Sequence, residues 1–388
     1  MKVCFVAHTA APLMGRPSGG LEGQTVLLAR HLEARGHDVT LVVPGLAGDP
    51  EVIEGVRLIS GWQPDRGLRF VRAFTYRYPT LRRTLAGLRA DAYYIRGVAY
   101  YTPSVVDAAH AANAHALVAL ASDRDLYPEA GRHSLGLGGP LAQRLTGRAG
   151  FAYFRRHGLL AADCILAQND DQMRSCDDLG LPWRRIRNVV EPPPADLLSV
   201  APSSDCIWVG NIPDSRRRAK GIDELVSLAT VLPDCSFLIV GDLSSPHIAA
   251  ATSKLAALAN VVLLGRRPHA ETLNAMAACR VVLNTSPSEG FSNVMLEGWA
   301  LGRPSVTLDV DPDRLLTRDG LGLCAGGNLA VMARRLSDLL HDERRLHTMG
   351  AAARTYVSQM HSPGSVCSAF EALVEELNDT RELPPSPP

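Results

Sequence analysis

NTSPSEGFSNVMLEGWALGRP, residues 284–304, carries the clearest structural signal in this 388-residue chain. An apolar run precedes it, a helical pattern fills its middle and a second apolar run follows. Ser292 or Gly290 can begin the helix, Gly302 can end it and Pro304 can open the next strand. The pattern predicts a strand, a loop, a helix and a strand in direct succession, which is typical of an α/β fold.

The loop in this stretch has the features of an anion site. The backbone amides of residues 290–294 would lie at the helix N-terminus, where unpaired N–H groups and the helix dipole favour phosphate. Glu289 comes just before these amides, and Glu297 follows about one and a half turns into the helix. Either acid alone is more often a solvated surface residue. Their pairing around this loop predicts a diphosphate held between a sugar and a ribose.

Short apolar runs alternate with helical patterns along the rest of the chain, which indicates mostly parallel α/β sheets. A Pro-rich connector around residues 192–204 interrupts this alternation of strands and helices and predicts a domain boundary. We predict an N-terminal Rossmann-like domain over 1–195, a C-terminal nucleotide-sugar-binding Rossmann-like domain over 196–350, and a helical segment with a frayed tail over 351–388. The last segment either stays apart or crosses back to the N-terminal domain. The predicted strands are residues 3–7, 39–43, 56–59, 92–95, 116–121, 164–167, 186–190, 206–209, 237–240, 261–264, 281–283 and 305–308.

Composition narrows the class of protein. Forty basic residues balance forty acidic ones, which argues against general affinity for nucleic acid, since binding to phosphate needs a basic surplus. No apolar stretch reaches membrane-spanning length. The eight cysteines are scattered without C-x-x-C spacing, so they predict reduced thiols in a cytoplasmic protein rather than disulfides or a metal site.

Several motifs resemble one known family. The segment from Glu289 to Glu297 resembles the E-x7-E motif of retaining glycosyltransferases of the GT-B fold, family 4, and EGFSNVMLEGWA is close to its usual form. Further segments that fall in family order are Gly19-Gly20, Trp208-Val209-Gly210-Asn211, Lys220-Gly221, Val240-Gly241-Asp242 and Gly302-Arg303-Pro304. The resemblance implies the α/β GT-B fold, in which two Rossmann-like domains face a central cleft.

The resemblance also implies roles for individual residues. Glu289 would be the catalytic residue beside the donor sugar, and Glu297 would hold the donor ribose. Lys220 would neutralise the diphosphate, whose negative charge grows as the glycosidic bond breaks. The other implied donor-binding residues are Gly19 and Gly20 of the first domain and Gly290, Phe291, Ser292, Asn293 and Val294 of the second.

The chain departs from the family pattern at two places. Asn211 stands where the family commonly has an arginine that binds phosphate, and Arg216, in the following run of arginines, is a candidate replacement. Many relatives also carry a histidine near the sugar after an N-domain strand, whereas this chain has Asp123 there. We therefore expect Asp123 on the acceptor or sugar side. His8 follows the first strand and so points towards the cleft, which makes it a second candidate for that side, although a hydrogen-bonded structural role is favoured for it.

The segment 66–89 is rich in arginine and aromatic residues. It predicts either a solvated amphipathic segment or peripheral docking on anionic lipid at the inner membrane face.

Together these patterns predict transfer of a sugar, with retention of configuration, from a nucleoside-diphosphate sugar to an acceptor hydroxyl. UDP-sugar is favoured on family frequency, and bacterial glycan, glycolipid or metabolite glycosylation is the expected setting. No metal or further cofactor is expected, because GT-B enzymes generally work without a bridging cation. Two alternatives stay open: a GT-B nucleotide-sugar 2-epimerase, and a non-catalytic nucleotide-sugar-binding subunit, which the departure at Asn211 would favour.

Overall fold

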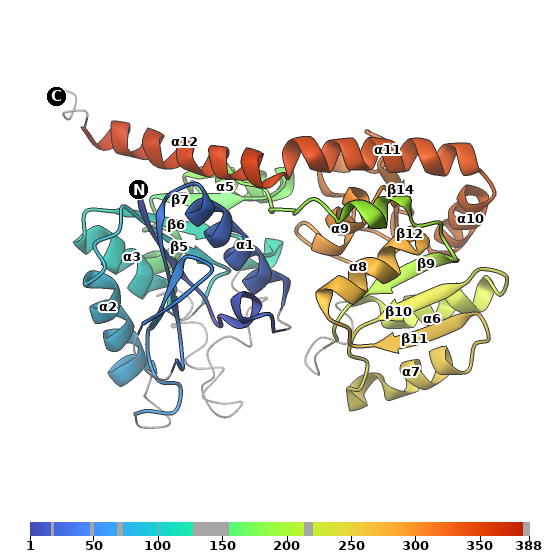
Figure 1. Ribbon diagram of the computed structural model, residues 1–388, viewed down its shortest axis with the longest axis horizontal. Coiled ribbons are helices and arrows are strands. Elements are labelled where there is room, and N and C mark those ends of the chain that lie inside the picture. Colours follow the sequence, from blue (N-terminus) through green and yellow to red (C-terminus); the bar gives the residue numbers. More distant parts are fainter. Residues whose placement is uncertain are drawn as a thin grey trace. The chain divides into compact units, whose positions relative to one another are not determined.

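A computed structural model describes residues 1–16, 19–46, 50–67, 73–99, 101–126, 155–212 and 220–382. The chain divides into two compact units, each built around one sheet (Figure 1). Unit 1 consists of Met1–Val189 and Pro363–Pro388, and unit 2 of Val190–Ser362. The predicted alternation of strands and helices is confirmed in both units.

The sheet of unit 1 has the order β3-β4-β2-β1-β5-β6-β7-β8, and only the β3–β4 pair is antiparallel. Its strands are β1 (Lys2–Val6), β2 (Asp38–Val43), β3 (Glu51–Ile53), β4 (Val56–Ser60), β5 (Ala92–Arg96), β6 (His115–Ala119), β7 (Cys164–Ala167) and β8 (Trp183–Arg185). Its α-helices are α1 (Gly20–Ala34), α2 (Tyr78–Ala86), α3 (Thr102–Ala111), α5 (Asp170–Asp178) and α12 (Pro363–Glu382).

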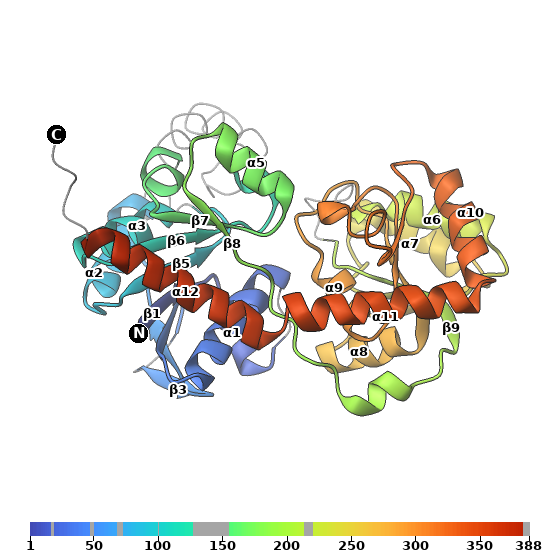
Figure 2. The same ribbon diagram turned by 90° about the horizontal axis from the view of Figure 1, so that it is seen from above.

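Helices cover both faces of this sheet, which explains why its central strands are continuous apolar runs. Apolar residues of α1 and α12 pack on one face of β1, β2 and β5, and α12 lies beside α1 over the sheet (Figure 2). Apolar residues of α2, α3 and α5 pack on the other face. Phe370 of α12 is fully buried and contacts the rings of Phe5 and Tyr94.

The sheet of unit 2 is entirely parallel, in the order β11-β10-β9-β12-β13-β14. Its strands are β9 (Ser204–Val209), β10 (Phe237–Val240), β11 (Val261–Gly265), β12 (Cys279–Asn284), β13 (Ser305–Thr307) and β14 (Gly322–Cys324). Its α-helices are α6 (Ile222–Val231), α7 (Ala249–Ala256), α8 (His269–Ala277), α9 (Asn293–Ala300), α10 (Leu329–Leu340) and α11 (Glu343–Met360).

This second unit has the same three-layer construction. Helices α6, α7 and α10 pack on one face of the sheet. Helix α8 and residue Val294 of α9 pack on the other face. Buried residues of α9 and α11 then form a further cluster around Trp299, which is fully buried. The long helix α11 is therefore part of the core of unit 2.

The observed boundaries differ from those expected at 195/196 and 350/351. Unit 2 begins at Val190 and includes α11, whereas α12 belongs to unit 1 because Val366, Phe370 and Leu373 fill its core. The backbone N–H of Val190 donates a hydrogen bond to the carbonyl of His361 at 2.8 Å. The two places where the chain passes between units are therefore adjacent.

Polar contacts also attach α12 to the rest of unit 1. Arg35 Nε and Nη2 donate to the two carboxylate oxygens of Glu371 at 2.7 and 2.6 Å, and His37 Nε2 lies 2.7 Å from Glu371 Oε1. The hydrogen bonds from Arg35 lower the pKa of Glu371 to about 2. Burial acts in the opposite direction, and the hydrogen bond from His37 lowers the pKa further. The carboxylate therefore stabilises the attachment of α12 at neutral pH.

We expect Glu371→Gln to loosen α12, with a loss of about 1 kcal/mol because the group is partly exposed. The lowered pKa means that this stabilisation is present above pH 4.5 and is lost as the pH falls towards about 2. The protection of α12 amides against hydrogen exchange should therefore differ between wild type and variant at pH 7, and the difference should shrink below pH 4.5. Glu375→Gln, which removes the same charge from the same helix, is the control. Equal protection in wild type and Glu371→Gln at pH 7 would contradict the prediction.

Candidate functional site

The predicted donor residues of unit 2 gather at the carboxyl edge of its sheet. Strand β9 lies between β10 and β12, so the loops that follow these three strands meet at one edge. Asn211 follows β9, Thr285 follows β12, and Lys220 lies two residues before the start of α6. Helix α9 begins at Asn293, close to the predicted position, and ends before Gly302, which has a φ of 71°.

Glu289 and Lys220 form an ion pair at this edge. Lys220 Nζ lies 2.6 Å from Glu289 Oε1, and Ser286 Oγ donates to the same oxygen at 2.7 Å. The side chain of Glu289 is only 15% exposed. Burial raises its pKa, but the charge of Lys220 and hydrogen bonds from Lys220, Ser286 and Ser292 lower it by more. The net pKa lies below the usual value, so this carboxylate is ionised at neutral pH.

The N-terminus of α9 lies next to Glu289. Ser292 is the N-cap residue, yet its side chain makes no cap hydrogen bond to the helix and instead bonds to Glu289. No acidic residue lies in the first turn of α9. The partial positive charge of the helix N-terminus is therefore not offset by a side chain of the helix itself.

The remaining predicted residues of this loop differ in how deeply they are buried. The side chain of Phe291 is buried and contacts the rings of Trp299 and His361, with centroids 6.2 and 5.2 Å away. The ring of Phe291 is therefore part of the core of unit 2. Gly290 is buried, and Asn293 and Val294 are half-buried.

Glu297 has a partner that sequence reasoning missed. His269 Nε2, in the first residue of α8, lies 3.1 Å from Glu297 Oε1. The hydrogen bond to Glu297 raises the pKa of His269, burial opposes this, and the charges of Glu297 and Glu191 add to the increase. The only signal in the sequence was a histidine after a predicted strand, which does not identify its partner.

We expect Glu297→Gln to lower the pKa of His269, because the variant removes the charge that stabilises the imidazolium. Since the folded-state pKa is raised, the pair stabilises unit 2 below the ordinary value of 6.5 and loses its effect as the pH rises through the higher value. An NMR titration of the His269 ring measures this shift. Glu271→Gln, on the same helix as His269 but paired with Arg267, is the control. An unchanged titration of His269 in Glu297→Gln would show that the pair does not persist in solution.

The side chain of Asn211 makes a hydrogen bond within unit 2. Its side-chain Oδ1 accepts a hydrogen bond from the backbone N–H of Asp242 at 3.0 Å. At the same place the backbones of β9 and β10 approach so closely that a Cβ at Gly241 would lie 1.8 Å from the carbonyl oxygen of Gly210. Asn211 therefore joins the loops after β9 and β10, and this contact gives no support to its predicted role in donor binding. Arg216, its predicted substitute, lies outside the described residues.

The predicted residues of unit 1 lie at the carboxyl edge of their own sheet. Gly19 is the N-cap residue of α1, and Gly20 is the first residue of that helix; both are exposed. His8 follows β1, and its Nδ1 lies 3.1 Å from the hydroxyl of Tyr101. Burial lowers the pKa of His8, although Glu22 acts in the opposite direction. This histidine is therefore mostly neutral at pH 7.

Asp123 also has a defined partner in unit 1. Its Oδ1 accepts a hydrogen bond from Gln172 Nε2 of α5 at 3.0 Å. Burial raises the pKa of Asp123, with a smaller increase from Asp171, and hydrogen bonds from Gln172 and Asn169 oppose the increase. The side chain of Asp123 is therefore attached to α5.

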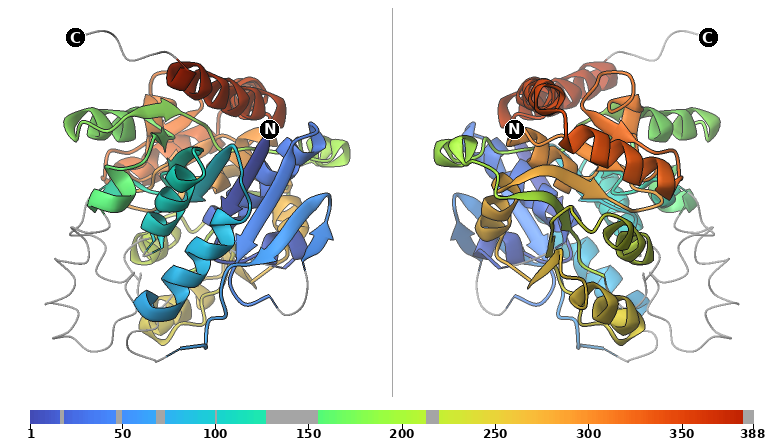
Figure 3. Two further views of the ribbon diagram at one scale, coloured as in Figure 1. Left: turned by 90° about the vertical axis from the view of Figure 1, so that its left-hand side faces the viewer. Right: turned by 90° about the vertical axis from the view of Figure 1, so that its right-hand side faces the viewer.

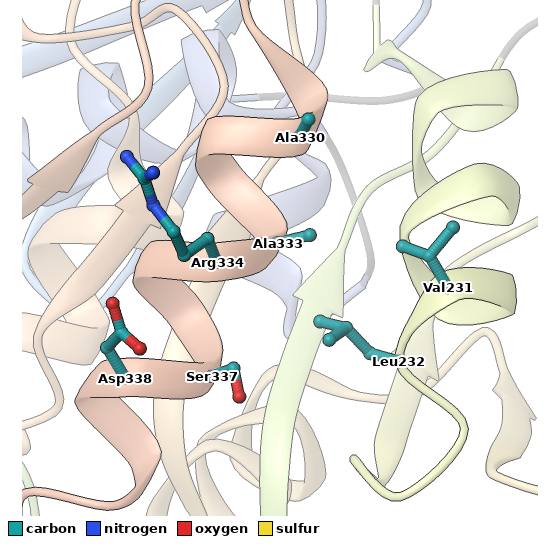
Figure 4. A pocket seen from close by; sticks show the side chains of 7 residues that line it. All are labelled: Val231, Leu232, Ala330, Ala333, Arg334, Ser337 and Asp338. Carbon is teal, nitrogen blue, oxygen red and sulfur yellow. The ribbon is translucent and has the colours of Figure 1, made fainter.

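A shallow pocket of about 350 Å³ lies elsewhere in unit 2, between α6 and α10 (Figure 4). None of the predicted site residues lines it, and its charged groups, Arg334 and Asp338, lie one turn apart on α10. Within the described ranges, no group of three metal-ligating side chains could hold a metal ion. No helix in the described part of the chain is long and apolar enough to cross a membrane.

Comparison with known proteins gives consistent results. Two family models match in chain order: a glycosyl transferase 4-like domain over residues 19–192 and glycosyl transferases group 1 over residues 203–342. No match was found among curated protein sequences.

Solved structures resemble most or nearly all of the chain. Sucrose-phosphate synthase from Thermosynechococcus elongatus aligns with a TM-score of 0.73 and 17% identity over 98% of this chain and 99% of its own. WaaG, a glycosyltransferase of lipopolysaccharide biosynthesis, aligns with a TM-score of 0.67 and 16% identity over 96% of this chain and 99% of its own. A variant of S. aureus TarM, solved in complex with UDP, aligns with a TM-score of 0.60 and 17% identity over 77% of this chain and 59% of its own.

These structures confirm the predicted GT-B fold, with its two Rossmann-like sheets. The two family models cover most of the chain. The group 1 match falls within unit 2, and the 4-like match lies in unit 1 apart from residues 190–192. The chain therefore belongs to the group 1 glycosyltransferases, the family 4 enzymes that transfer a sugar from a nucleotide sugar.

Proposed function

We propose that this glycosyltransferase moves a sugar from a UDP-sugar to an acceptor hydroxyl with retention of the anomeric configuration, in bacterial glycan, glycolipid or metabolite glycosylation. The observation that carries the site assignment is the Lys220–Glu289 ion pair at the N-terminus of α9. The cation and the helix N-terminus are suited to bind a diphosphate. The largely buried, ionised carboxylate beside them is suited to accept hydrogen bonds from sugar hydroxyls.

Each group has a part in the proposed reaction. The bond between the anomeric carbon and the diphosphate oxygen breaks, and its electron pair stays with the diphosphate. The acceptor oxygen forms a bond on the same face of the sugar, and the acceptor proton passes to the leaving diphosphate. Lys220 and the amides at the start of α9 stabilise the growing negative charge. Glu289 contacts the sugar through its ionised carboxylate, and Glu297 binds the ribose hydroxyls.

We propose that no metal ion takes part. Lys220 and the N-terminus of α9 supply positive charge where a bridging cation would otherwise act. Transfer should then continue at the same rate in EDTA, and loss of activity that added Mg²⁺ restores would overturn this point.

The preference for uridine is supported by the S. aureus TarM structure, which holds UDP. Calorimetric titration with UDP, GDP and ADP tests it directly. We expect the tightest binding for UDP, and a preference for GDP or ADP would assign a different donor. Incubation with the matching nucleotide sugars then tests transfer, because release of the nucleoside diphosphate should depend on an added acceptor. Conversion of the donor into its 2-epimer would instead support an epimerase.

We further propose that unit 1 docks on anionic lipid from the cytoplasmic side. Helix α2, the light-blue helix at the front of Figure 3 (left), contains no acidic residue. It buries Leu81 and Leu85 and exposes Arg82 and Arg83. Arg69 and Arg72 of the predicted 66–89 segment lie outside the described residues. Binding to phosphatidylcholine vesicles should require added phosphatidylglycerol and fall when both arginines of α2 become glutamate. The same change at Arg344 and Arg345, an exposed pair on α11, is the control.

A further inference from the structure

Lys220 is held in place by a threonine that the family motifs do not assign. Thr285 Oγ1 donates a hydrogen bond to the backbone carbonyl of Lys220 at 2.9 Å. The same hydroxyl accepts a hydrogen bond from Trp208 Nε1 at 3.0 Å. Both Thr285 and Trp208 are buried, so neither hydrogen bond competes with bulk water. The hydroxyl therefore joins β9, the loop after β12 and Lys220, two residues before α6.

The backbone next to Lys220 is packed against the same residue. Gly221 has a φ of 60°, and a Cβ at this position would lie 1.9 Å from the carbonyl oxygen of Thr285. Only glycine tolerates both this conformation and this approach. The orientation of Trp208 is restricted as well, since a Cβ at Gly210 would lie 2.7 Å from its ring.

The hydrogen bond from Thr285 to the Lys220 carbonyl restricts the positions that the Lys220 ammonium can reach. Thr285 lies in the same loop as Glu289, so anchoring Lys220 to Thr285 fixes the lysine backbone relative to the carboxylate. With that anchor in place, Lys220 Nζ lies 2.6 Å from Glu289 Oε1. Without it, the long lysine side chain would start from a backbone with greater freedom, and its charge would be less well placed.

We propose that Thr285 is a positioning residue that places Lys220 for the donor diphosphate through its hydroxyl group. This inference rests on the proposed function, in which Lys220 binds that diphosphate.

Thr285→Val keeps the shape of the side chain and removes the hydroxyl. We expect it to weaken UDP binding about 3- to 10-fold, the range expected for one net hydrogen bond. The KM for the donor should rise by a similar factor, while the KM for the acceptor stays unchanged. Thr285→Ser restores the hydroxyl and should return UDP affinity to within about 2-fold of wild type.

A matched control separates positioning from general stability. Thr307 is also fully buried in unit 2, and its hydroxyl donates to the carbonyl of Val310 at 2.7 Å. Thr307→Val should therefore destabilise the fold without a comparable loss of UDP affinity. In a Lys220→Ala background, Thr285→Val should have little further effect on UDP affinity, because the group that it positions is absent.

The outcomes distinguish this inference from the proposed function. Failure of the wild type to bind UDP, GDP or ADP would overturn the proposed function and the inference with it. If the wild type binds UDP and Thr285→Val binds it equally well, only the inference is overturned. The inference would also be overturned if Thr307→Val lost as much UDP affinity as Thr285→Val. An additive loss of UDP affinity when Thr285→Val is combined with Lys220→Ala would overturn it as well. If Thr285→Val does not fold, Trp208→Phe, which removes the hydrogen bond to Thr285 together with part of the indole ring, should weaken UDP binding. Unchanged binding in that variant would overturn the inference.

Discussion

Glu289→Gln is expected to lower the rate of sugar transfer by at least about 100-fold, the effect typical of removing one electrostatic group that acts on a transition state. The variant keeps the size of the side chain and its ability to accept from Ser286, but it loses the negative charge beside the sugar. UDP affinity should be retained or rise slightly, because Lys220 loses its competing partner within the protein.

Single-turnover transfer and calorimetric titration with UDP measure the two effects separately. Glu271→Gln, which removes a half-exposed carboxylate from the same unit, should leave both unchanged. Transfer at close to the wild-type rate in Glu289→Gln would exclude this carboxylate from the reaction. A parallel loss of UDP binding would place it at the nucleotide rather than at the sugar.

Lys220→Ala is expected to weaken binding of the donor diphosphate by about 1.5–3 kcal/mol, the range for a hydrogen bond to a charged group. Uridine, which has no phosphate, should bind the variant and the wild type equally well. Lys254→Ala, at an exposed lysine of α7 in the same unit, is the matched control. Equal weakening of UDP and uridine would mean that the variant damages the site in general.

The same variant should raise the pKa of Glu289. In the wild type, the charge and hydrogen bond of Lys220 outweigh the effect of burial and keep this pKa below its usual value. Because the folded-state pKa is lowered, the pair stabilises unit 2 above the ordinary value of 4.5 and loses its effect as the pH falls through the lowered value. The pH profile of any residual transfer by Lys220→Ala should accordingly shift its acid limb to higher pH.

The sequence allowed prediction of features that depend on local patterns. Buried parallel strands leave continuous apolar runs, so β1, β2, β5 and β9–β12 were predicted close to their observed positions. The strand expected at residues 186–190 was wrong, because β8 is Trp183–Arg185. This strand lies at the edge of its sheet and is partly exposed, so it carries no apolar run.

The site could be predicted only in part. Glu289 and Lys220 were recognised as separate motif residues 69 positions apart, but nothing local indicates that they form an ion pair. The contacts of Thr285 with Trp208 and of His269 with Glu297 likewise join distant segments, and they depend on how helices pack on the sheet. Asn211 shows the converse: a departure from the family pattern suggested a lost phosphate contact, whereas its side chain serves a local hydrogen bond.

The discontinuity of unit 1 has a consequence for synthesis on the ribosome. Val190–Ser362 is one continuous piece of chain, and it can fold as soon as it has emerged. The first 189 residues cannot complete their core until later, because α12 contributes Phe370 and its neighbours to it and is made after unit 2. Until then, the apolar face of β1 and β5 lacks part of its cover. The nascent chain therefore completes its second unit before its first, and the interval between the two is when it most needs protection from aggregation.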